Sequence, residues 1–187
     1  KASRMPRRRT SHASVNSAPP ADATAVKEAH QLLKRAIDLD TDFAEAHAHL
    51  GCLLADEYAD YDAAEKEFRL AMQLPGSEQL AFPCFKLALL LEHERHDHDG
   101  AIEMYERALA IDPRHAQAHF ALGSVLEHSK GDKSGAEERY TEALEFDADH
   151  SEAHFALATL LNARFEYDRA EDHYNSAIRL DPYNAEA

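Results

Sequence analysis

The fold is decided by residues 119–143, which read HFALGSVLEHSKGDKSGAEERYTEA. The first half carries the pattern His-x2-Leu-Gly-x2-Leu from His119 to Leu126, and the second half carries Ala-x3-Tyr-x2-Ala from Ala136 to Ala143. Spacings of three and four place side chains on one face of an α-helix. The stretch therefore predicts two amphipathic helices joined by a turn near residues 130–135.

Both patterns recur along the chain, so this stretch is one copy of an internal repeat. The second pattern begins at Ala64, Ala101, Ala136 and Ala170, with a weaker copy at Ala29, and successive copies lie 35, 37, 35 and 34 residues apart. The first pattern begins at His47, Cys84, His119 and His154, once before each strong copy. One such helix pair cannot cover its own apolar face, so the repetition predicts a stack of helix pairs with a continuous core.

The residue types within each copy fit that packing. A small residue in the first helix lets the two backbones approach to about 8–10 Å where they cross. These small residues are Gly51, Ala88, Gly123 and Ala158. The ring of the second pattern is expected to fill the gap toward the next pair, at Phe68, Tyr105, Tyr140 and Tyr174.

This combination resembles the tetratricopeptide repeat, including a proline after the second helix at Pro113 and Pro182. The resemblance covers about residues 22–187 and implies an all-α fold, a right-handed α-solenoid of antiparallel helix pairs. The boundaries that it predicts are a leading helix at 22–40, repeats at about 43–75, 78–113, 115–148 and 150–182, and the start of a further helix at 183–187.

The chain departs from the family pattern in two ways. His47, Cys84, His119 and His154 replace the leading aromatic residue of the first helix. The small residue and the first alanine of the second helix are 13 residues apart in the first three repeats and 12 apart in the last. We therefore expect one extra residue in each of the first three turns. We also expect the histidines to be neutral rings in an apolar seam, so that the array loses stability between about pH 6.5 and 5.

Residues 1–20 differ in kind from the repeats, because they hold five basic residues and no acid. Their net charge is +5, so the remainder carries −20 of the total of −15. We expect an extended arm that reaches an acidic partner, or the acidic body of the protein, through Arg4, Arg7, Arg8 and Arg9. The composition resembles the end of a transit peptide, which favours a chloroplast or mitochondrion over the cytoplasm. A nuclear signal at residues 7–9 is the alternative.

The rest of the sequence excludes several classes of function. A body that carries −20 repels nucleic-acid phosphates, and no apolar run approaches the 18 residues of a membrane span. Cys52 and Cys84 are too few for a disulfide framework, which indicates an intracellular protein. No catalytic motif is present, so we expect neither enzyme activity nor a cofactor. The histidine-rich turn at 93–98 includes Arg95, which would repel a metal ion, so no metal site is expected.

A candidate binding surface follows from the residue after each leading His or Cys, which is Phe85, Phe120 or Phe155 in the last three repeats. In tetratricopeptide proteins the positions that these residues resemble line a concave groove that holds peptides. We therefore predict an exposed aromatic groove at Phe82, Phe85, Leu89, His93, Phe120, Ser124, His128, Phe155 and Thr159. The alternative is that the rings pack between successive first helices and meet no ligand.

The groove lacks the Lys and Asn pattern with which one subset of the family grips the C-terminal carboxylate of heat-shock chaperones. It favours an amphipathic helix or an extended apolar segment with basic residues at its edges. The sequence thus predicts a non-catalytic scaffold or assembly subunit that binds other protein subunits or peptide segments. A soluble adaptor or co-chaperone with transient clients and a regulatory domain of a longer enzyme are the alternatives.

Overall fold

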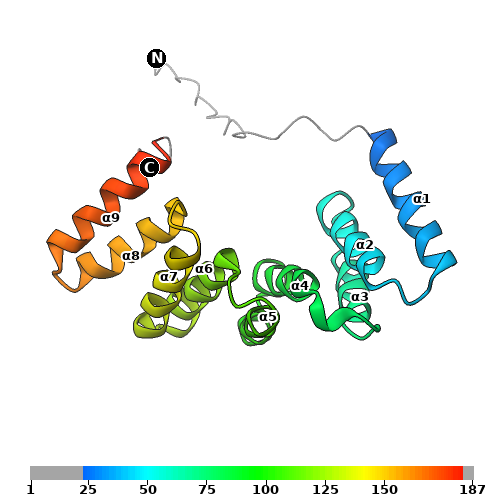
Figure 1. The fold of residues 1–187 in the computed structure, drawn as a ribbon, viewed down its shortest axis with the longest axis horizontal. Helices are drawn as coiled ribbons and strands as arrows, with labels where there is room; N and C mark the ends of the chain where they lie inside the picture. The colour runs from blue at the N-terminus through cyan, green and yellow to red at the C-terminus, as the bar shows by residue number, and fades with distance from the viewer. Residues whose placement is uncertain (1–22, 183–187) are drawn as a thin grey trace, which may run out of the picture.

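The computed structural model describes residues 23–182, so the arm predicted at residues 1–20 and the helix predicted from residue 183 lie outside it. The helices form an arc with α1 at one end and α9 at the other (Figure 1). All regular structure in the described part of the chain is helical, which confirms the all-α prediction. The helices are α1 (Ala23–Leu39), α2 (Ala44–Asp56), α3 (Tyr61–Ala71), α4 (Ala81–His93), α5 (His98–Ile111), α6 (Ala116–Val125), α7 (Lys133–Phe146), α8 (Ser151–Ala163) and α9 (Tyr167–Leu180), with short helical turns η1 (Ser77–Gln79) and η2 (Leu126–Lys130).

The small residues lie where the two helices of a pair cross, as predicted. A Cβ added to Gly51 would lie 2.7 Å from Cε1 of Phe68, and one added to Gly123 would lie 2.7 Å from Cε1 of Tyr140. The ring of the second helix therefore lies directly on the backbone of the first helix of its own pair. Phe68 and Tyr140 are each 1% exposed, so these rings form the centre of the core.

Two buried tyrosine hydroxyls each donate a hydrogen bond to a carboxylate on, or directly after, the first helix of their own pair. Tyr105 Oη donates to Glu92 Oε2 at 2.7 Å, and Tyr140 Oη donates to Glu127 Oε2 at 2.9 Å. Burial, together with the nearby carboxylate, raises the pKa of both tyrosines well above its usual range. In the first pair the ring is Phe68, which needs no acceptor, and alanine replaces the glutamate.

The turns within the pairs share one backbone feature. The residue before the N-cap of each second helix has a positive φ, at Ala59, His96, Gly131 and Phe165. In the first three turns the N–H of the N-cap bonds to a carbonyl six residues back, as from Asp60 to Leu54. In the last turn Glu166 bonds to Leu161, five residues back. The extra residue predicted for the first three turns thus appears as one more residue between the donor and the acceptor of this closing hydrogen bond. In the third pair the lengthened turn includes the π-helical turn η2.

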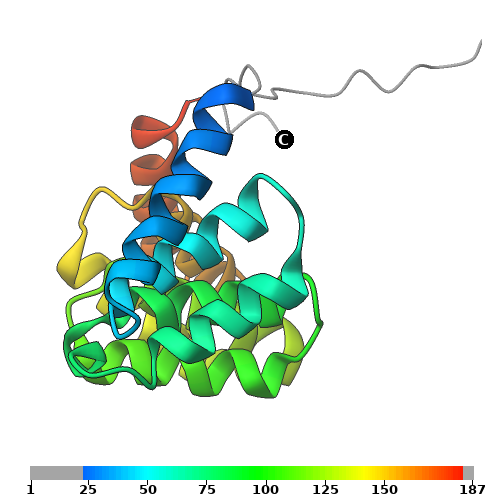
Figure 2. The same ribbon diagram turned by 90° about the vertical axis from the view of Figure 1, so that its right-hand side faces the viewer.

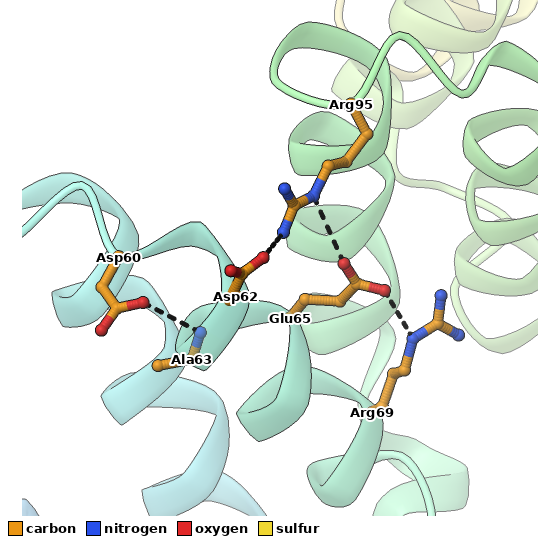
Figure 3. A network of polar contacts seen from close by, with 6 residues as sticks. All are labelled: Asp60, Asp62, Ala63, Glu65, Arg69 and Arg95. Carbon is orange, nitrogen blue, oxygen red and sulfur yellow. Dashed lines mark hydrogen bonds and ion pairs between the residues drawn. The ribbon is translucent and has the colours of Figure 1, made fainter.

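Ion pairs connect the turns of the last three pairs with the preceding helix pair. Arg95 contacts Asp62 on α3, and its Nε lies 3.5 Å from Oε2 of Glu65, which also accepts from Arg69 (Figure 3). The histidine-rich turn at 93–98 thus holds an arginine because that side chain binds the previous pair. The same relation recurs between Lys130 and Asp99 and between Arg164 and Glu137. Such exposed pairs each add little stability, so the core carries the fold.

Candidate functional site

A cavity of about 540 Å³ opens between the last two helix pairs, and we call it the C-terminal cavity. Rings from α6, α7, α8 and α9 make up much of its wall. Its lining also holds two carboxylates, and no lysine or arginine is among the described residues that form it. The lining residues are Phe120, Ser124, His128, Tyr140, Ser151, Glu152, Phe155, Ala156, Tyr174, Ala177, Ile178 and Asp181.

A second cavity of about 330 Å³ lies between α2, α3 and α4, and we call it the N-terminal cavity. Its lining mixes apolar side chains such as Leu89 with charged ones such as Lys86 and Glu94. Burial raises the pKa of the Cys52 thiol at its wall to about 11, although nearby Lys86 acts in the opposite direction. A thiol that stays protonated at neutral pH is a poor nucleophile.

The structure brings six of the nine predicted groove residues to these two cavities. Leu89 and His93 line the N-terminal cavity, and the C-terminal cavity receives Phe120, Ser124, His128 and Phe155. Thr159 lies beside the C-terminal cavity, since its Oγ1 is 3.3 Å from the hydroxyl of Tyr174. Phe82 is half-exposed near α2, with its ring centroid 5.5 Å from that of His49.

The expected exposure of Phe85 is wrong, because its side chain is only 5% exposed. Its ring centroid lies 5.9 Å from that of Tyr105 in the same pair and 4.7 Å from that of His115 in the next pair. At this position the alternative interpretation holds, since the ring packs between successive pairs. The exposed aromatic ladder therefore does not extend over all three phenylalanines.

The imidazole that covers Phe85 is also a helix cap. His115 precedes α6, and its Nδ1 accepts from the N–H of Ala118 at 3.3 Å. His150 caps α8 in the same way and lies 4.8 Å from the ring of Phe120. This role was not expected from the sequence, although the 35-residue spacing of the two histidines, just before α6 and α8, was a signal for it. Phe85 and Phe120 each thus have the histidine cap of the next pair beside their ring.

Phe155 has no such cover within the described residues. Its side chain is 56% exposed, and its only ring neighbour there is Tyr174, at 5.7 Å. The next cap position, residue 184, lies outside the described part of the chain. Ile178 in the same cavity is 49% exposed. Among the described residues, the last pair therefore exposes a ring at Phe155 whose counterparts are buried at Phe85 and half-buried at Phe120.

Two leading histidines are held by polar contacts on both ring nitrogens. His47 Nδ1 lies 2.7 Å from Oε2 of Glu67, and its Nε2 lies 3.3 Å from a backbone carbonyl of the preceding loop. His119 Nδ1 lies 3.0 Å from Oε2 of Glu142, and its Nε2 lies 3.0 Å from such a carbonyl. Each of these rings therefore lies between a carboxylate and a backbone carbonyl. The expected apolar seam is therefore wrong for these two histidines, because the atoms nearest their ring nitrogens are oxygens.

The last pair differs, because His173 stands at the position of Glu67 in the first pair. His154 Nδ1 lies 2.8 Å from His173 Nδ1, and two protonated rings would repel each other at this distance. Burial, and then the positive charges of His154 and Arg169, lower the pKa of His173. A base with a lowered folded pKa contributes stability above its unfolded pKa of about 6.5, and this stability is lost as the pH falls.

A comparison with known protein families matches part of the chain. Residues 92–161 match the sequence profile of the tetratricopeptide repeat. The chain contains tetratricopeptide repeats. Comparison with curated proteins gives no significant match.

Several solved structures share the fold of this tetratricopeptide array. The crystal structure of MamA aligns with a TM-score of 0.72 at 19% identity, over 88% of this chain and 94% of that one. PilF of Pseudomonas aeruginosa aligns with a TM-score of 0.74 at 20% identity, over 84% and 69%. YrrB, described as a protein with an unusual peptide-binding site, aligns with a TM-score of 0.66 at 19% identity, over 86% and 80%.

Two further findings concern residues 23–182. No helix in this range is long and apolar enough to cross a membrane. No group of three or more His, Cys, Asp or Glu side chains there is arranged to hold a metal ion.

Proposed function

We propose that the chain is a non-catalytic interaction scaffold whose C-terminal cavity binds a segment of another protein. The observation that carries this proposal is the exposure of Phe155, at 56%, inside a wall formed with other rings. Covering one such side chain contributes about 1.5–3 kcal/mol. The peptide-binding site described for YrrB, which has the same fold, supports this use of the array.

The lining indicates the chemistry of the bound segment. Rings and Ile178 favour apolar side chains, whereas Glu152 and Asp181 favour basic residues beside them. An amphipathic helix or an extended segment with Lys or Arg at its edges meets both requirements. The N-terminal cavity, with Leu89 and His93, would extend the contact of a longer segment toward α2.

The wider role that we propose is assembly within a larger protein complex. The charge contrast between residues 1–20, at +5, and the remainder, at −20, supports a second contact through the arm. The composition of that arm favours a chloroplast or mitochondrion over the cytoplasm. A transient adaptor would use the same cavity but would release its clients quickly, so the residence time of the partner separates the two roles.

Affinity capture with matched variants tests the proposal. Phe155→Ala removes the exposed ring of the C-terminal cavity, whereas Phe165→Ala removes a 76% exposed ring of the same pair outside it. We expect proteins retained by the native chain and by Phe165→Ala to be lost with Phe155→Ala, with an affinity about 10-fold or more weaker. Retention of the same proteins by both variants would contradict the proposal.

A further inference from the structure

A second uncovered apolar surface lies on α1, the outermost helix at the other end of the array (Figures 1 and 2). Leu32 is 66% exposed and Leu39 is 81% exposed. They belong to a row in which successive residues are four, three, four and three apart, a spacing that keeps side chains on one face of a helix. We call this row the α1 seam, and it consists of Ala25, Ala29, Leu32, Ala36 and Leu39.

The seam corresponds to the surface that other pairs bury. Ala29 and Ala36 match Ala64 and Ala71 of α3, which are both 0% exposed. Leu32 matches Glu67, whose carboxylate contacts His47 of the first helix in that pair. The helix α1 thus has the form of a second helix, and within the described residues no first helix of its own covers it. An apolar leucine stands where α3 has a carboxylate.

We propose that the α1 seam pairs with the α1 seam of a second copy of the chain, in an antiparallel arrangement about a two-fold axis at Leu32. The positions of the seam are spaced almost symmetrically about that residue, at seven and three residues before it and four and seven after it. Leu32 would meet Leu32, Ala29 would meet Ala36, and Leu39 would lie over Ala25 of the other copy. Small residues at the crossing let the helices approach, and large residues opposite small ones fill the space.

The charges beside the seam complement each other in the same arrangement. Glu28 and Arg35 lie on the same flank of the seam, since they are seven residues apart, and both are exposed. Neither takes part in an ion pair among residues 23–182. Antiparallel pairing brings Glu28 of one copy beside Arg35 of the other, and it does so twice. Parallel pairing would instead place this flank beside the other flank of the partner helix and form neither Glu28–Arg35 contact, so the flank specifies orientation as well as partner.

Analytical ultracentrifugation of the 187-residue chain tests the pairing. One helix from each copy makes a small interface, so we expect a concentration-dependent monomer–dimer equilibrium rather than a permanent dimer. Leu32→Glu should raise the dimer dissociation constant at least 10-fold. Gln31→Glu adds the same charge away from the seam and should leave it unchanged. A chain that stays monomeric, or a Leu32→Glu variant that dimerises normally, would overturn the proposal.

A charge exchange distinguishes self-pairing from any other use of the seam. Glu28→Arg and Arg35→Glu should each weaken the dimer, because each opposes like charges across the axis. The double variant restores both contacts in reversed order, so it should recover the native dissociation constant. Failure of this recovery, in variants with native helix content by circular dichroism, would overturn the antiparallel arrangement. This inference is independent of the C-terminal cavity and survives if that cavity binds nothing.

Discussion

Phe85 and Phe155 occupy the same position in two repeats and have opposite environments. Phe85 lies between two helix pairs at 5% exposure, whereas Phe155 lies at the wall of the C-terminal cavity at 56% exposure. The helices that carry them have the same pattern, and the difference comes from the next pair. His115 covers Phe85, and no described residue does the same for Phe155. Repeat position fixes which face a side chain occupies, and its neighbours decide whether that face is core or surface.

The largest difference between the two regions should appear in stability. Phe85→Ala removes a ring that neighbours Tyr105 and His115, and it should lower the free energy of unfolding by about 3–5 kcal/mol. Phe155→Ala removes a ring that is mostly solvated, and it should cost less than about 1 kcal/mol. Chemical denaturation of both variants measures this contrast. Equal losses would show that the two rings have similar surroundings.

The hydroxyl partners of the tyrosines give a second contrast. Tyr140→Phe leaves the half-buried Glu127 without its donor and should cost about 1–1.5 kcal/mol. The hydroxyl oxygen of Tyr174 lies 3.3 Å from that of Thr159. This contact is at the cavity wall, where water can replace the hydroxyl of Tyr174 as a partner for Thr159. Tyr174→Phe should therefore change the free energy of unfolding by a few tenths of a kcal/mol. The comparison fails if Tyr174→Phe costs as much as Tyr140→Phe.

The turns of the third and fourth pairs should respond in opposite directions. Phe165 has a φ of 64°, a conformation that costs a non-glycine residue about 1 kcal/mol, so Phe165→Gly should raise the melting temperature. Gly131 has a φ of 69° with open space around its Cβ position, so Gly131→Ala should lower it by a similar amount. A matched pair of thermal scans measures both. Shifts in the same direction would contradict this account of the turns.

The smallest effect concerns pH in the last pair. Because the pKa of His173 is lowered, the protection of α8 and α9 in hydrogen exchange should decrease as the pH falls from about 7 to 5. His173→Glu converts the pair into the histidine–carboxylate contact of the first pair, so the decrease should become smaller or reverse. Protection that falls equally in the native chain and in the variant would assign the pH dependence elsewhere.

The sequence predicted the fold well because its signals are local and repeated. The helix crossings at Gly51 and Gly123 and the extra turn residue could all be predicted from the spacing of residues in the sequence. The solvent exposure of each phenylalanine could not be predicted from spacings, because it depends on whether the next helix pair contacts the ring. His115 and His150 were visible in the sequence, but their effect on the preceding ring appears only when pairs stack.

The charged partners of the buried histidines were as difficult to predict from the sequence as the contacts between pairs. The burial of these histidines follows from the repeat pattern, and His47 and His119 are each 5% exposed. Their polar partners, Glu67 and Glu142, lie about 20 residues away on the second helix. Patterning identifies the helix face of a carboxylate but not the ring that it meets. The sequence therefore located the buried His47 and His119 correctly but assigned apolar surroundings to both, and His154, which was also expected to be buried, is half-buried.

The central claim is that a first-helix phenylalanine is core when another pair covers it and a binding surface when none does. Solvent exposure of single rings tests this claim most directly, by fluorine NMR of 4-fluorophenylalanine placed singly at positions 85, 120 and 155. A soluble paramagnetic agent should broaden the signal strongly at 155, less at 120 and hardly at 85. Equal broadening at 85 and 155, or a protected ring at 155, would contradict the account.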